Sequence, residues 1–229
     1  MKKLTVSIGH TETILGWIYL GLQIIVIPIA LVIINSLLPR PFSDAELNFL
    51  SFAINFICIT VIFHQYLLKC LKVFLNEPGL TLTNCLKGFG IYWLSSILVN
   101  YLVISLDPQF SNVNDENIAV LTGDSNLLMF VGTVLLVPTV EETLYRGLVF
   151  GNLYRKQPII AYVLSVTIFA ALHILGYIGM YPLPRLLLCF LQYIPAGITL
   201  AWTYVQTGTI WAPILIHMTV NLIGMLAMQ

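Results

Sequence analysis

The sequence predicts an all-α protein, a polytopic membrane bundle of about seven transmembrane helices (six to eight fit the same pattern). Composition is the first reason, because 59% of the 229 residues are hydrophobic and only 9% are charged, whereas soluble domains carry about 25% charge. The mean hydropathy of +0.93 is the second reason. The third is length, since several apolar stretches reach the roughly 18 residues that a membrane-spanning helix needs.

The apolar stretches follow one another along the whole chain. They cover residues 14–38, 47–68, 85–106, 127–150, 158–177, 185–206 and 210–228. The first is too long for a signal-peptide core and lacks a small-residue cleavage site, so it is expected to remain as a span. Residues 69–84 have the pattern of a short amphipathic helix at the membrane interface, and residues 107–126 that of a polar loop. No repeat or linker divides the chain, so residues 1–229 are expected to form a single membrane domain.

Lysine and arginine residues lie mostly on one side of these spans, and this asymmetry predicts the orientation in the membrane. The richer side holds Lys2, Lys3, Lys69, Lys72, Lys87, Arg155 and Lys156. The other side holds only Arg40 and Arg185, together with most of the acidic residues. The amino terminus is therefore expected in the cytoplasm. A net charge of zero without a basic stripe argues against a nucleic-acid-binding surface.

Residues 139–148, TVEETLYRGL, place three charges inside the fourth predicted span. Such charges cost roughly 2.5–3.5 kcal/mol near the bilayer centre, so they usually pair, face a cavity or take part in chemistry. Glu142 and Arg146 are four residues apart and can pair on one helix face. Glu141 is rotated from Glu142 by about 100° and is left without a cation, which suits a general acid or base. The alternative is a salt bridge that only holds helices together, with Glu141 as a bystander.

Polar residues recur in two later spans. His173 ends the sequence FAALH, and HMTVN places His217 and Asn221 one helical turn apart on a shared face. A single histidine on an apolar helix is usually a hydrogen-bonded packing residue. Polar residues on three different spans instead favour one common site inside the bundle.

A common site of this kind has the groups that amide hydrolysis requires. Hydrolysis needs a base that activates water and donors for the oxyanion that develops. Glu141 with His173 is expected to hold and deprotonate the water. His217 and Asn221 are expected to donate hydrogen bonds to the tetrahedral oxygen.

The remaining pair, Glu142 and Arg146, is expected to fix the helix that presents Glu141. A second assignment makes Glu141, His173 and His217 the ligands of Zn²⁺, a set that catalytic zinc accepts. No HExxH helix occurs in the sequence, however, and a metal-bound Glu141 would leave no clear base. Hydrolysis without a cofactor is therefore favoured, and zinc or another divalent metal is the alternative.

The motifs EETLYR, FAALH and HMTVN, in this order on successive spans, resemble the EExxxR, FxxxH and HxxxN pattern of the CPBP (Abi) family. That family contains the type II CAAX prenyl proteases, and the resemblance covers roughly residues 127–225. It implies an all-helical intramembrane endopeptidase in which the motif residues have the roles given above. The family is often labelled a metalloprotease, while a glutamate-dependent, metal-free mechanism is also argued for it.

The resemblance also implies a membrane-associated peptide or protein substrate. Eukaryotic and archaeal relatives remove a C-terminal tripeptide from prenylated CAAX proteins, and many bacterial members are linked to pheromone or bacteriocin maturation and self-immunity. The compact chain looks like the bacterial type, which implies the cytoplasmic membrane. One alternative is a non-catalytic immunity or scaffold protein. Another is a small transporter that uses the Glu and His residues as a proton relay, although no half-chain symmetry supports it.

Overall fold

The computed structural model describes residues 4–227, which form helices and short connections without any β-strand. The elements are α1 (His10–Gly21), η1 (Leu22–Val26), α2 (Ile27–Leu37), α3 (Asp44–Ile62), α4 (His64–Asn76), α5 (Pro78–Leu106), α6 (Val113–Asp124), α7 (Asn126–Phe130), η2 (Val131–Leu136), α8 (Val137–Glu141), η3 (Glu142–Phe150), α9 (Gly151–Tyr154), α10 (Pro158–Leu175), α11 (Leu183–Thr207) and α12 (Trp211–Ala227). The predicted all-α class is confirmed.

Six continuous helices are long and apolar enough to cross a membrane. They cover His10–Leu37, Asp44–Ile62, Pro78–Leu106, Asn126–Tyr154, Pro158–Leu175 and Leu183–Thr207. The seventh predicted span coincides with α12, which is apolar but has only 17 residues; residue 228 of that prediction lies outside the described part of the chain. The order of the predicted spans is therefore confirmed, and the lengths differ.

The predictions for two connecting segments were wrong. The polar loop expected at residues 107–126 contains helix α6, which begins at the capping residue Asn112, whose side chain accepts a hydrogen bond from the backbone N–H of Asn114. The amphipathic helix expected at 69–84 is divided, because α4 already begins at His64 and α5 begins at Pro78. Proline suits the first turn of a helix, where its missing N–H is not needed.

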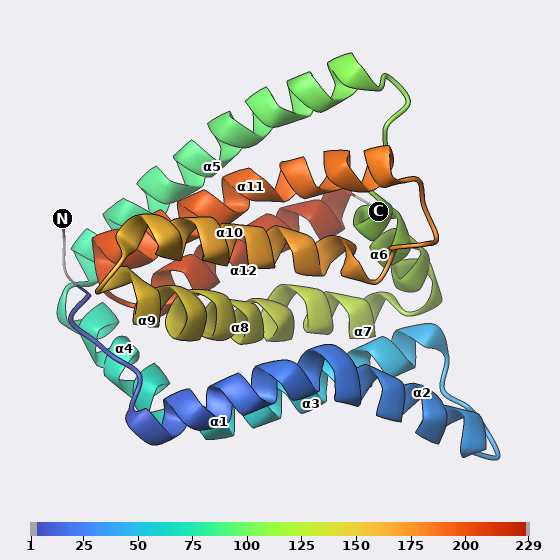
Figure 1. Ribbon diagram of the computed structural model, residues 1–229, viewed down its shortest axis with the longest axis horizontal. Helices are drawn as coiled ribbons and strands as arrows, with labels where there is room; N and C mark the ends of the chain where they lie inside the picture. Colours follow the sequence, from blue (N-terminus) through green and yellow to red (C-terminus); the bar gives the residue numbers. More distant parts are fainter. Residues whose placement is uncertain (1–3, 228–229) are drawn as a thin grey trace.

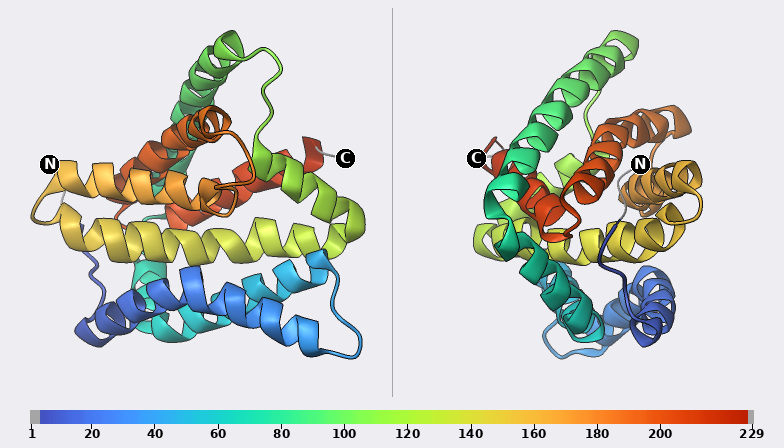
Figure 2. Two further views of the ribbon diagram at one scale, coloured as in Figure 1. Left: turned by 45° about the vertical axis from the view of Figure 1, so that its right-hand side comes forward. Right: turned by 90° about the vertical axis from the view of Figure 1, so that its left-hand side faces the viewer.

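The long helix from α7 to α9 is the centre of the bundle, with α1 to α3 packed on one side and α10 to α12 on the other (Figure 1). It is not a regular α-helix, because η2 and η3 have π-helical hydrogen bonding. Pro138 lies between these segments and has no N–H to donate. π-Helical turns such as η2 and η3 frequently occur at functional sites. Helix α5 packs on α11 and α12 and leans away from the rest of the bundle (Figure 2).

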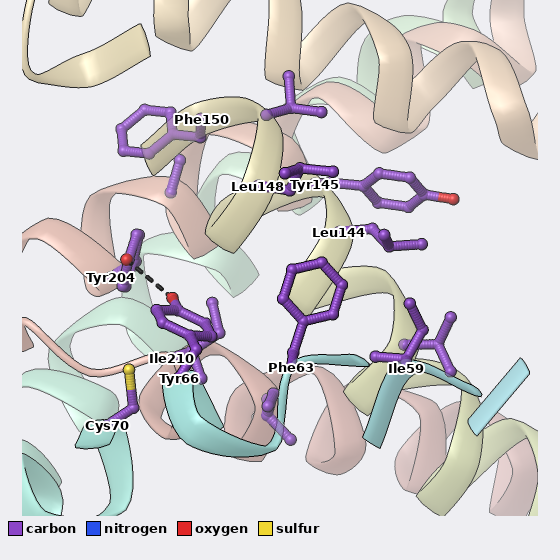
Figure 3. Packing of buried hydrophobic residues seen from close by; sticks show 14 of the residues in the cluster. Ile59, Phe63, Tyr66, Cys70, Leu144, Tyr145, Leu148, Phe150, Tyr204 and Ile210 are labelled. Carbon is purple, nitrogen blue, oxygen red and sulfur yellow. Dashed lines mark hydrogen bonds between the residues drawn. The ribbon is translucent and has the colours of Figure 1, made fainter. Parts of the chain in front are cut away.

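An apolar cluster anchors the central helix in the bundle. Figure 3 shows Leu144 and Leu148 of η3 packed with Phe63, and the hydroxyl groups of Tyr66 and Tyr204 joined at 2.9 Å. All five side chains are almost completely buried. This packing holds the turn that carries Glu141 and Glu142 in a fixed position.

Candidate active site

A cavity of about 1000 Å³ lies between the central helix and its neighbours. Its wall includes Glu141, His173, His217 and Asn221, which come from α8, α10 and α12. Three helices that are far apart in the sequence therefore place the predicted residues around one space.

Glu142 and Arg146 form a fully buried ion pair, with Arg146 Nη1 3.0 Å from Glu142 Oε1. The same oxygen lies 2.9 Å from Nδ1 of His217. The guanidinium stands over the ring of Phe169, 4.1 Å from its centroid, and Nη2 donates to the carbonyl of Gly197 at 3.5 Å. The predicted ion pair is confirmed, and its contacts join η3 to α10, α11 and α12.

Glu141, the adjacent acid, has a different environment. Its Oε2 lies 3.9 Å from Nε2 of His173, and the two side chains are 17% and 15% exposed. This oxygen is buried and has no hydrogen-bond partner among the described residues. The ring of His173 stacks on Tyr193, with centroids 4.1 Å apart. Glu141 therefore has an acceptor atom that no described residue satisfies.

The hydrogen bond on the other side of the His173 ring determines which nitrogen faces Glu141 as an acceptor. Nδ1 lies 2.7 Å from the carbonyl oxygen of Phe169. A carbonyl can only accept, so Nδ1 carries the proton and Nε2 of the neutral ring has a lone pair. At 3.9 Å, Nε2 and the Glu141 oxygen are too far apart for a direct bond. A molecule that donates two hydrogen bonds, such as water, can bridge them.

His217 and Asn221 lie one turn apart on α12, as predicted, but each is already hydrogen-bonded. His217 contacts Glu142 through Nδ1. The amide of Asn221 donates to the backbone carbonyl of Thr133 in η2, at 2.8 Å. One nitrogen of His217 and one N–H of Asn221 therefore remain for a ligand.

The alternative zinc assignment was tested against the spacing of the side chains. Within residues 4–227, no three His, Cys, Asp or Glu side chains are spaced to hold a metal ion. The imidazoles of His173 and His217 each bond through Nδ1 to an oxygen acceptor, an arrangement also found behind metal-ligating histidines. The zinc alternative, with Glu141 as third ligand, stays a prediction.

One contact of the site has a signal in the motifs, and the others have none. The carbonyl of Phe169 bonds to His173 one turn later, which is the FxxxH spacing. The Asn221 acceptor Thr133 and the stacked ring of Tyr193 belong to segments with no chemical motif. Gly197 had no signal either; a methyl group there would lie 2.9 Å from a methyl carbon of Val166, so the close approach of α10 and α11 requires glycine.

Residues 123–223 match the family model described as Type II CAAX prenyl endopeptidase Rce1-like. This part of the chain is similar to the Rce1-like family. The match contains all three motifs and overlaps the catalytic core expected at residues 127–225, and the resemblance seen in the sequence is confirmed. Together with the apolar helices, this similarity indicates an integral membrane protein.

Two curated proteins are also similar to this chain. UPF0177 protein YxdF of Lactococcus lactis subsp. lactis (strain IL1403) is 28% identical over 161 residues, which cover 62% of this chain and 81% of YxdF. The protein named "Putative membrane peptidase YdiL", of Bacillus subtilis (strain 168), is 34% identical over 151 residues. That match covers 64% of this chain and 56% of YdiL. No solved structure matches the chain significantly.

Proposed function

We propose that this protein is an intramembrane endopeptidase that hydrolyses a peptide bond of a membrane-associated peptide or protein. The observation that carries the proposal is the pair of acceptor atoms on Glu141 and His173, 3.9 Å apart on the wall of the cavity. The Rce1-like domain and the similarity to a protein named as a membrane peptidase support the same reaction class.

Water bound between Glu141 and His173 is the nucleophile of the proposed reaction. The Glu141 carboxylate takes one proton from the water while the water oxygen bonds to the carbonyl carbon of the peptide. The electron pair of the carbonyl moves to its oxygen, which becomes the oxyanion. The proton on Glu141 then passes to the amide nitrogen, the C–N bond breaks, and an amine and a carboxylic acid leave.

His217 is the proposed donor to the oxyanion. Its Nδ1 hydrogen donates to the Glu142 carboxylate, so the role requires a second hydrogen, on Nε2, for the oxyanion. Asn221 offers its second N–H to the same oxygen.

The substrate class follows the family and is part of the proposal. A CAAX-type protein or a bacterial pheromone or bacteriocin peptide would reach the cavity from the membrane. The proposed location is the bacterial cytoplasmic membrane, with the amino terminus on the cytoplasmic side. The alternative is a non-catalytic immunity or scaffold protein that uses the same bundle for binding.

Cleavage of a membrane-associated peptide by the purified protein tests the proposal. We expect Glu141→Gln to lower kcat by a factor of about 10²–10⁴, the usual contribution of a general base, and His173→Asn to lower it as well. Asp124→Asn is the control, because Asp124 is exposed at the end of α6 and does not line the cavity. If both variants keep the kcat of the parental protein, Glu141 and His173 are not the catalytic residues. Retained biological activity of Glu141→Gln without cleavage would favour the scaffold alternative.

A further inference from the structure

A second acidic residue, Asp115 of α6, lines the same cavity as Glu141 and His173. Two contacts fix the start of α6 on α11. Glu116 pairs with Arg185 at 2.8 Å, and the amide of Asn112 donates to Gln192 at 2.7 Å. Asp115 therefore occupies a defined position on the cavity wall.

The carboxyl group of Asp115 has no partner. No ion pair or hydrogen bond joins its side chain to another residue in the described range 4–227. The residue is exposed, yet desolvation raises the pKa of its carboxyl to about 6. A carboxyl that is accessible and desolvated at once opens onto a cavity rather than onto bulk solvent.

Three tyrosines line the same cavity as this carboxyl. Tyr92, Tyr177 and Tyr193 each lie close enough for the charge of Asp115 to act on their hydroxyl groups. The hydroxyl of Tyr177 donates to Asn114 and that of Tyr193 to Asn112, both at 3.3 Å. The hydroxyl groups of these two residues are therefore already engaged, and one face of the Tyr193 ring stacks on His173.

A carboxylate and aromatic rings on the wall of one cavity are groups that recognise an ammonium or guanidinium group. The faces of tyrosine rings attract cations within about 6 Å, by roughly 0.5–2 kcal/mol, and hydrogen bonds between opposite charges are stronger than neutral ones. We propose that Asp115, with Tyr92, Tyr177 and Tyr193, forms a subsite for a lysine or arginine side chain of the peptide substrate. This inference rests on the proposed function, since it names the substrate class of the same cavity.

Tyr193 connects the subsite to the reacting groups. Its ring stacks on the imidazole of His173. The charge of Asp115 acts on its hydroxyl group. A peptide whose basic side chain is bound at Asp115 would therefore extend along the cavity toward Glu141.

A purely structural role for Asp115 is already filled by its neighbour. Acidic residues in the first turn stabilise a helix through its dipole, and both Asp115 and Glu116 occupy the first turn of α6. Glu116 also bonds to Arg185 and Ser111, which fasten α6 to the bundle. Asp115 makes no such contact, and its place on the cavity wall leaves the carboxyl available to a ligand.

Binding by the Glu141→Gln protein tests the subsite without turnover. The probes are three labelled apolar peptides that differ at one position, which is lysine, glutamine or glutamate. In phosphatidylglycerol nanodiscs we expect the lysine peptide to bind about tenfold more tightly than the glutamine peptide, and the glutamate peptide to bind most weakly. Asp115→Asn should remove the difference, and the control Glu116→Gln should keep it. Thermal unfolding confirms that each variant is folded.

Equal affinities for the three peptides, or a lysine preference that survives Asp115→Asn, would overturn the inference. A preference lost in nanodiscs that contain phosphatidylethanolamine would assign the site to a lipid ammonium group and overturn the peptide assignment. The parental protein separates the two proposals. Charge-dependent binding without cleavage would remove the proposed function and leave the subsite, whereas cleavage without charge preference would do the reverse.

Discussion

Two helices of this protein each carry a pair of adjacent carboxylates, and the two members of each pair differ in the same way. In the central helix, Glu142 is fully buried against Arg146, whereas Glu141 is partly exposed and one of its oxygens has no partner among the described residues. On α6, Glu116 pairs with Arg185, whereas Asp115 lines the cavity without a partner.

The difference between the two acids of a pair follows from helix geometry and from the groups that contact each face of the helix. Successive residues on a helix point about 100° apart, so one acid can face a packed neighbour while the next faces a cavity. An acid with a cation partner stabilises the packing of helices. An acid without one costs stability, and the cost is understandable where the group binds or converts a ligand.

Arg146→Met is the variant with the largest expected effect, and it tests the buried member of the first pair. Removal of the guanidinium leaves Glu142 charged in a fully buried position, which typically costs about 3–5 kcal/mol of folding free energy. We expect a sharp loss of folded protein, measured by size-exclusion chromatography and thermal unfolding in detergent.

Arg185→Met is the matched control for this variant. Its ion pair with Glu116 is partly exposed, and such pairs contribute about 0–1 kcal/mol. Similar losses in the two variants would show that burial does not distinguish the two pairs. A normal yield of Arg146→Met with lost cleavage would instead place Arg146 in the chemistry.

His217→Asn is expected to have the next largest effect, because His217 belongs to both environments. It bonds to buried Glu142 through Nδ1 and also lines the cavity. Loss of one oxyanion donor lowers kcat by about 10²–10³, so we expect this decrease together with a small change in KM. A raised KM at unchanged kcat would assign His217 to substrate binding alone.

Much of this arrangement follows from local sequence patterns. The order of the spans follows from apolar length, and the ion pair between Glu142 and Arg146 follows from their spacing on one helix face. Helix α6 was missed because its residues are polar, although an asparagine cap followed by acidic residues is a usual signal for the start of a helix.

The contacts between helices could not be predicted in the same way. The bond from His217 to Glu142 joins residues 75 positions apart, and it depends on how α12 is rotated against a π-helical segment. Pattern analysis assigns faces with the α-helical period, which η2 and η3 do not keep. The same limit applies to Asp115, whose neighbour Tyr193 comes from another helix.

Asp115→Asn should have the smallest effect of these variants. The effect is a change in how the stability of the folded protein depends on pH. Desolvation raises the pKa of Asp115 from 3.8 to about 6, so the folded state holds this proton more tightly than the unfolded chain does. The stabilisation from protonation is present below the unfolded pKa and is lost as the pH rises toward about 6. Asparagine avoids the loss, so the variant should unfold at a slightly higher temperature than the parent at pH 8 and at the same temperature at pH 3.5. Because Asp115 is exposed to the cavity, solvent reduces the difference. A variant that unfolds at a lower temperature at pH 8 would show that the carboxylate stabilises α6, and the two pairs of acids would then no longer be alike.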